Sequence, residues 1–135
     1  MPNIPEVVRK EKNLKTLDKG VTASGLGKLL RGRGPYTFFA PSDNAFNKMG
    51  ASNVEYLLKP ENKVQLDALL NQHIIGHRVN FKDLKDGDIL KTLAGKEVTV
   101  KIKGTKVSID GAAILNADVQ SSNGVIHSLD AVLIN

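Results

Sequence analysis

The sequence has no cysteine and no tryptophan, and aromatic residues make up only 4% of its 135 residues. Without cysteine, the chain can form neither a disulfide nor a thiolate metal site. No segment approaches the roughly 20 consecutive apolar residues that a transmembrane helix needs. The first residues also lack the apolar core of a signal peptide. A hydrophobic fraction of 41% is nevertheless enough for a buried core, and we expect residues 1–135 to form a single domain.

Positive charge exceeds negative charge, with a formal net charge of +5 at pH 7. The lysines are spread along the chain, and the densest basic stretch, from Arg31 to Arg33, is very short. A nucleic-acid-binding surface usually combines a basic stripe with aromatic side chains. We therefore expect no nucleic-acid partner, whereas an acidic glycan or an anionic lipid surface remains compatible with the charge.

Hydrophobic patterning predicts a helical first part and a β-rich last part. Leu14, Leu17 and Val21 repeat at intervals of three and four residues, which is typical of one face of an amphipathic helix. Residues 98–109 alternate between apolar and polar side chains, which predicts strands with one solvated face. A last strand or pair of strands is expected over residues 125–134. The pattern therefore predicts helices first and strands afterwards along the chain.

Turn signals divide the β-rich part. The Asp-Gly pair at 110–111 and the Asn-Gly pair at 123–124 are the dipeptides that two-residue hairpin turns prefer. We expect the chain to reverse at both places.

Residues 37–46 are typical of a strand that turns directly into a helix. The first half holds two of the four phenylalanines, which indicates a buried strand. Pro41 ends that strand because proline has no N–H to donate to a neighbouring strand. Ser42 is a candidate helix N-cap, and Asp43 places negative charge in the first turn. We interpret Asp43 as a structural residue.

The histidines predict no metal site. His73 and His77 have the spacing of a zinc-binding helix, but Ile74 stands where that motif requires a glutamate base. The segment between them is also a poor helix former. We expect a buried, hydrogen-bonded His73 and a loop position for His77.

No catalytic set is recognisable. His127, Ser128 and Asp130 supply the residue types of a hydrolase triad, but neighbours on a strand point to opposite faces. We expect no enzymatic activity and no cofactor. The remaining enzyme alternative combines Asp43 with His73 or His127, and it requires a cleft that holds both groups with shifted pKa values.

Two stretches resemble the signatures of the fasciclin-like domain family. Residues 37–46 (TFFAPSDNAF) resemble the first signature, and residues 123–133 (NGVIHSLDAVL) resemble the second. The resemblance covers nearly the whole chain. It implies an α+β wedge in which helices pack along one side of a twisted β-sandwich. The family signature positions, which we expect to be structural, are Thr37, Pro41, Asp43, Phe46, Gly124, His127 and Asp130.

The resemblance also implies an adhesion function. It predicts a module outside the cell, in the periplasm or on the cell surface, that binds a cell-surface protein, a matrix protein or a glycan. A signal peptide would then have been removed or would lie outside this sequence. The lack of glycosylation sequons, of an Arg-Gly-Asp triplet and of cysteine favours a prokaryotic member.

Four residues are candidates for partner binding by this resemblance. Asp118 and Val119 match an Asp-Ile pair that is associated with integrin binding in animal members, and Gln72 and His73 match a Tyr-His pair. Because isoleucine has become Val119 and tyrosine has become Gln72, we expect integrin recognition to be weakened or lost. Some family members instead carry apolar molecules such as carotenoids, which requires an apolar groove.

Overall fold

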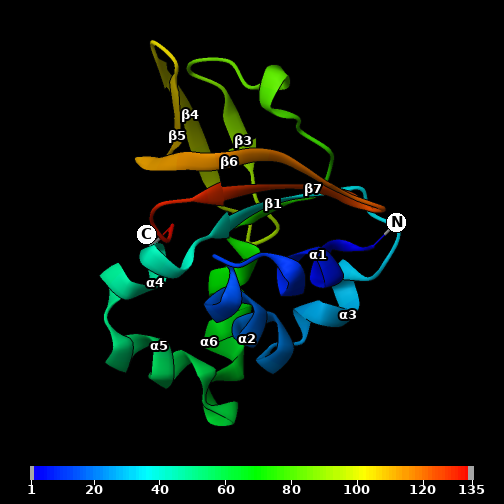
Figure 1. The fold of residues 1–135 in the computed structure, drawn as a ribbon, viewed down its shortest axis with the longest axis vertical. Coiled ribbons are helices and arrows are strands. Elements are labelled where there is room, and N and C mark those ends of the chain that lie inside the picture. Colours follow the sequence, from blue (N-terminus) through cyan, green and yellow to red (C-terminus); the bar gives the residue numbers. More distant parts are fainter. Residues whose placement is uncertain (1, 134–135) are drawn as a thin grey trace.

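The computed structural model describes residues 2–133, and it separates a helical half from a half made of sheet (Figure 1). The α-helices within those residues are α1 (Ile4–Lys10), α2 (Lys15–Ala23), α3 (Leu26–Leu30), α4 (Asp43–Met49), α5 (Ala51–Leu58) and α6 (Lys63–Asn71). Two short 3₁₀ helices are η1 (Pro60–Asn62) and η2 (Phe81–Asp83). The strands are β1 (Tyr36–Pro41), β2 (Ile74–Ile75), β3 (Ile89–Lys91), β4 (Glu97–Lys103), β5 (Lys106–Ile109), β6 (Ala112–Ser121) and β7 (Gly124–Leu129).

The seven strands form one mixed sheet in the order β2-β1-β7-β6-β5-β4-β3. β1 and β7 run parallel, and every other neighbouring pair is antiparallel. A single bridge between Ile75 and Thr92 brings the two ends of the sheet together, so the sheet curls until it is nearly closed. The fold is therefore α+β, as the sequence predicts.

The parallel pair joins the two signature stretches directly. Tyr36 lies opposite Gly124, and Pro41 lies opposite Leu129, so β1 and β7 are in register along their whole length. Residues that are far apart in sequence thus become neighbours in the middle of the molecule (Figure 1).

Strand β1 is buried on both faces, which explains its continuous apolar run. Phe38 packs into a helix-side core with the apolar faces of α1, α2 and α6. Phe39 points the other way, into a second core enclosed by the curled sheet. Because successive side chains of a strand point to opposite faces, one strand serves both cores.

The corner after β1 forms as the sequence predicts. The Ser42 hydroxyl accepts a hydrogen bond from the Ala45 N–H at 3.3 Å and caps α4. The turn at Asp110 and Gly111 is also present, since both residues have positive φ angles.

Three predictions for the second half need correction. β3 and β6 were not expected from the pattern. β7 ends at Leu129, so residues 130–133 are not a strand, and residue 134 lies outside the described part. The reversal expected at Asn123 and Gly124 occurs one residue earlier, because Gly124 already belongs to β7.

Across residues 2–133, none of the helices combines the length and the apolar character that would let it cross a membrane.

Candidate interaction surface

The loop after β2 is fastened to β1 by Thr37. The Thr37 hydroxyl donates to the His77 carbonyl at 2.7 Å and accepts from the Val79 N–H at 2.7 Å. One fully buried side chain thus satisfies two backbone groups of a segment that has no strand partner of its own. The loop is thereby held against the sheet.

His127 holds the same loop from β7. Its ring stacks on Phe39, with the ring centroids 5.7 Å apart. Nδ1 accepts from the Asp118 N–H at 3.1 Å, so Nε2 must carry the proton that it donates to the Val79 carbonyl at 2.8 Å. Burial lowers the pKa of His127 below its ordinary value, which keeps this neutral tautomer in place at neutral pH.

Asp118 lies at an irregularity in β6, where the pairing with β7 shifts register. Its φ angle of 57° is in the left-handed region that aspartate tolerates better than most residues. The side chain is exposed, and one carboxylate oxygen accepts from the Phe81 N–H at 2.8 Å. This bond ties β6 to η2 and fixes the direction of the carboxylate.

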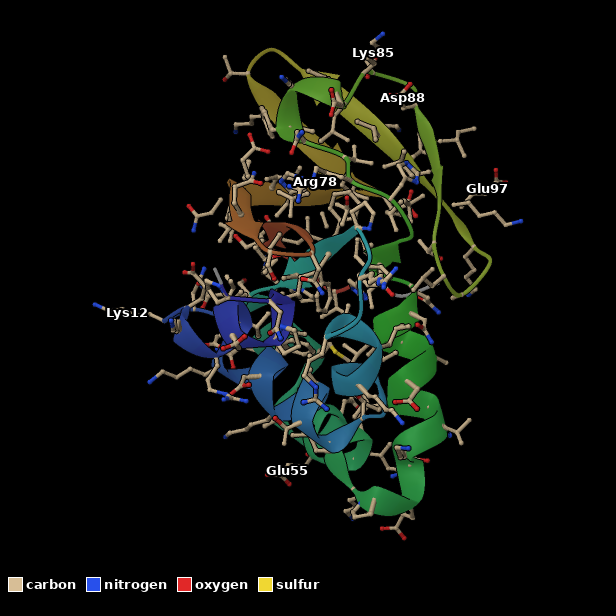
Figure 2. All side chains as sticks on the ribbon, turned by 90° about the vertical axis from the view of Figure 1, so that its right-hand side faces the viewer. Lys12, Glu55, Arg78, Lys85, Asp88 and Glu97 are labelled. Carbon is tan, nitrogen blue, oxygen red and sulfur yellow. The ribbon has the colours of Figure 1, made fainter. Side chains whose placement is uncertain are left out.

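Two more side chains complete a surface around this carboxylate. Arg78 donates to the Gln120 side-chain carbonyl at 2.6 Å, and the Gln120 amide donates to the Asp118 carbonyl at 3.3 Å. We call Arg78, Asp118 and Gln120 the Asp118 surface. Figure 2 shows Arg78 among the strands, in the half of the molecule that contains the sheet.

His73 is fully buried. Its Nδ1–H donates to the Leu69 carbonyl at 2.8 Å, and Nε2 accepts from the Leu133 N–H at 2.9 Å. Burial lowers the pKa of His73 to about 4. His73 therefore links the end of α6 to the end of the described chain, and it has no exposed surface for a partner to contact.

The other two residues suggested for binding are half-buried. Gln72 is the C-cap of α6, and Val119 packs against the helix-side core. Of the four candidates, Asp118 alone is exposed.

Asp43 connects the two helices that begin near it. Its carboxylate accepts from the Thr16 N–H at 2.8 Å, and its own N–H donates to the Asn13 carbonyl at 2.8 Å. Leu14, at the N-cap of α2, supplies no side-chain cap. Asp43 therefore acts as the cap that α2 lacks.

Asp130 has a comparable role beyond the end of β7. Its carboxylate accepts from the Ala113 N–H at 2.8 Å, and its N–H donates to the Ala113 carbonyl at 3.0 Å. Lys48 donates to the Asp130 carbonyl at 3.0 Å. These bonds join the start of β6, the end of β7 and α4.

The remaining signature positions are buried. Pro41 ends β1 beside Leu129, and Phe46 packs into the helix-side core. A Cβ atom on Gly124 would lie 2.1 Å from the Tyr36 carbonyl oxygen, closer than atoms can approach. Gly124 is thus required for the close contact between β1 and β7.

Asn123 is a central residue whose structural role is not indicated by the sequence pattern. Its side-chain carbonyl accepts from the Ile4 N–H at 3.1 Å and from the Ser121 hydroxyl at 3.3 Å. Its amide group donates to the carbonyls of Leu30 and Gly32. The Asn-Gly dipeptide at 123–124 predicts a turn. A turn signal carries no information about hydrogen bonds to residues that are distant in sequence.

None of the three concavities described within residues 2–133 is lined by Asp43, His73 or His127, so the enzyme alternative gains no support. Asp43, His73 and His127 are each engaged by separate backbone groups, and none of these hydrogen bonds links one of the three to another. Within residues 2–133, no group of three His, Asp or Glu side chains is arranged to hold a metal ion.

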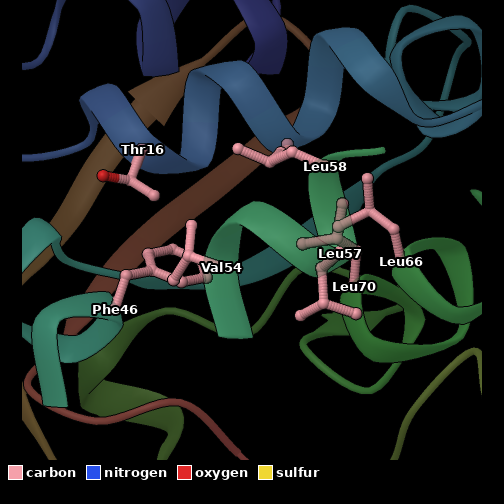
Figure 3. Close-up of a pocket in the computed structure, with 8 residues that line it drawn as sticks. Thr16, Phe46, Val54, Leu57, Leu58, Leu66 and Leu70 are labelled. Carbon is pink, nitrogen blue, oxygen red and sulfur yellow. The ribbon is translucent and has the colours of Figure 1, made fainter. Parts of the chain in front are cut away.

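The helices enclose a small apolar pocket of about 10 Å³ beneath α5 (Figure 3). Ligand sites for small molecules usually have volumes of roughly 300–1,000 Å³. A pigment-sized molecule would require α5 to move, so this pocket does not favour the carrier alternative. The pocket is lined by Thr16, Gly20, Phe46, Val54, Leu57, Leu58, Leu66 and Leu70.

The curled mixed sheet, the helices on one side and the paired signature strands define the class of module that fasciclin domains form. The family model described as "Fasciclin domain" matches residues 12–135, and the chain belongs to this family. A solved structure of a FAS1 domain pair from the insect cell adhesion molecule fasciclin I superposes with a TM-score of 0.88 at 18% identity. It covers 99% of this chain and 51% of that chain, and at this identity it shows the fold.

Relatives occur in bacteria and in animals. The chain is 38% identical to protein sll1483 of Synechocystis over 131 residues, which is 97% of this chain and 72% of that protein. It is 30% identical to the uncharacterized protein sll1735 of Synechocystis, over 99% of this chain and 98% of that protein. It is 40% identical to transforming growth factor-beta-induced protein ig-h3 of pig over 98% of this chain, which spans only 19% of that protein.

Proposed function

We propose that this chain is a non-enzymatic adhesion module that binds a protein or glycan on a cell surface or in an extracellular matrix. Membership of the fasciclin domain family supports this proposal, as does the fold shared with an insect cell adhesion molecule. The module would act outside the cell, in the periplasm or on the cell surface, with residues 1–135 working as one domain.

We place the contact with the partner at the Asp118 surface. The observation that carries this assignment is that Asp118 is exposed while its backbone and one carboxylate oxygen are fixed by His127 and Phe81. Within residues 2–133 the second carboxylate oxygen has no hydrogen-bond partner, so it can accept a hydrogen bond from a partner. A side chain that is already ordered loses little conformational entropy on binding.

The charges of this surface suit a polar contact. Arg78 and Asp118 place opposite charges on the loop and on β6, and Gln120 bonds to both residues. A partner that presents a donor to the carboxylate and an acceptor to the guanidinium would be held in one orientation. His73, which is buried, would influence binding only through the packing of α6 and the end of the chain.

The proposal predicts saturable binding of the purified chain to surfaces coated with cells or with matrix extract. The measurement is binding of labelled protein over a range of concentrations, with a surface coated with denatured protein as control. Binding that does not saturate, or that equals the control, would count against an adhesion function.

A further inference from the structure

A second concave region lies between α1, α2 and α3, which are neighbours in the helical half (Figure 1). The cleft has a volume of about 320 Å³ and is separate from the pocket beneath α5. It is lined by Pro5, Arg9, Asp18, Val21, Thr22, Ser24, Gly25, Gly27, Lys28 and Arg31. Sites of this volume are large enough for a small organic group.

Positive charge dominates the cleft. Arg9 reaches it from the last turn of α1, while Lys28 and Arg31 come from the end of α3. All three are exposed, and the single acidic side chain in the lining is Asp18. Among residues 2–133, no hydrogen bond or ion pair engages the side chains of these three cations. At the edge, near Gly25, the Lys63 ammonium and the Asp67 carboxylate lie together and offset one another, so the excess of positive charge comes from Arg9, Lys28 and Arg31.

Cations gathered around one concavity repel one another unless an anion joins them. A concave wall of low dielectric also focuses the field and raises the local concentration of anions. Because the cations come from two separate helices, a ligand with several negative groups can meet more of them than a single ion can.

The rest of the lining does not favour two other polyanions, nucleic acid and a lipid bilayer. None of the ten lining residues is aromatic, so the cleft offers no platform on which nucleic-acid bases could stack. Val21 and Pro5 are buried, so no lining apolar side chain projects far enough to enter a lipid bilayer. Small residues, including Gly25 and Gly27, form much of the wall and leave space between the cations.

We propose that this cleft binds the sulfate or carboxylate groups of an acidic polysaccharide. The proposal rests on the proposed adhesion function, because it names a glycan class for that function. It assigns the glycan to a cleft of its own rather than to the Asp118 surface. The interaction is electrostatic, so it weakens as salt is added.

The test compares two charge-matched triple variants of the full chain. The cleft variant is Arg9→Gln, Lys28→Gln and Arg31→Gln. The control variant is Lys85→Gln, Lys103→Gln and Lys106→Gln, which removes three exposed cations from the sheet half. Figure 2 shows Lys85 at the end of the sheet remote from the helices. Binding is measured by calorimetry with dextran sulfate, carboxymethyl dextran and neutral dextran, and thermal melts confirm folding.

We expect wild type and the control variant to bind the charged dextrans but not neutral dextran. The cleft variant should bind about tenfold more weakly or worse, as expected for the loss of three exposed contacts. Binding to sulfate alone or to carboxylate alone would identify which group the cleft prefers. Equal weakening in both variants, unchanged binding in the cleft variant or no binding by wild type would overturn the proposal. So would binding to phosphatidylglycerol vesicles without binding to the polysaccharides.

Measuring adhesion of the same variants separates the two proposals. If the cleft variant binds the charged dextrans and adheres as wild type does, the glycan assignment fails and the adhesion proposal stands. If wild type binds the dextrans through the cleft but adheres to no coated surface, the adhesion proposal fails and the cleft assignment stands.

Discussion

At the scale of single residues, the two buried histidines act as neutral connectors between backbone groups. His73 joins the Leu69 carbonyl to the Leu133 N–H, and His127 joins the Val79 carbonyl to the Asp118 N–H. Each ring uses one nitrogen as donor and the other as acceptor. Adding a proton would replace the acceptor by a second donor facing an N–H group.

This arrangement predicts that acid destabilises the protein. The pKa of His73 is about 4 in the folded protein, against 6.5 for an ordinary histidine. Between these values the unfolded chain binds more protons, so the free energy of unfolding falls as pH is lowered from 6.5 to 4 and levels off below. His73 alone should account for roughly 3 kcal/mol. Burial also lowers the pKa of His127, so His127 adds to the loss of stability in acid.

Urea unfolding at a series of pH values measures this loss. His73→Gln should flatten the dependence on pH, because glutamine does not titrate. His77→Gln is the control, since it removes a histidine from an exposed position. A wild-type protein whose stability is constant across this pH range would contradict the assignment.

At the scale of secondary-structure elements, the parallel contact between β1 and β7 organises the molecule. β1 supplies Thr37 and Phe39, and β7 supplies His127, so the support for the loop before η2 comes from two adjacent strands. Their close approach depends on Gly124, which leaves space for the Tyr36 carbonyl.

We predict that Gly124→Ala destabilises the protein by more than about 3 kcal/mol or prevents folding, because backbone must move to admit the methyl group. Gly76→Ala is the matched control, since its Cβ would meet only the Leu93 side chain at 3.4 Å. Thermal melts of the two variants decide the matter. A Gly124→Ala protein as stable as the control would show that β1 and β7 pack less closely than described.

Local sequence patterns predicted elements better than they predicted contacts. The stripe of Leu14, Leu17 and Val21 is buried on α2, and the alternation over residues 98–109 forms β4 and β5. β6 was missed because its first four residues, Ala112 to Leu115, are all apolar, so no alternation marks the beginning of the strand.

The roles of side chains that link separate elements were harder to predict, because their hydrogen-bond partners are distant in sequence. Asn123 bonds to Ile4 across 119 positions, and no local pattern contains that information. The family resemblance identified both signatures, but their pairing as neighbouring parallel strands emerged from the fold. Burial of His73 was predicted from the sequence and is confirmed, whereas the exposure of Asp118 depends on the packing around it.

At the scale of the whole molecule, the buried signatures and the exposed candidate surface have different roles. Thr37 and His127 hold the loop before η2. The Phe81 N–H, at the start of η2, in turn fixes the carboxylate of Asp118. Thr37 and His127 are buried, whereas Asp118, which we propose contacts the partner, is exposed. A variant that keeps the support and changes only the exposed charge therefore separates binding from folding.

Asp118→Asn is that variant, because asparagine tolerates the left-handed conformation and keeps an oxygen for the Phe81 N–H. Asp110→Asn is its control: Asp110 also has a positive φ, of 48°, and its carboxylate accepts from the Thr99 N–H at 2.7 Å. The decisive measurement is the affinity of both variants for the coated surface that binds wild type, with melting temperatures alongside. We predict that Asp118→Asn melts as wild type does but binds about tenfold more weakly, whereas Asp110→Asn binds normally. Wild-type affinity in folded Asp118→Asn would contradict the account.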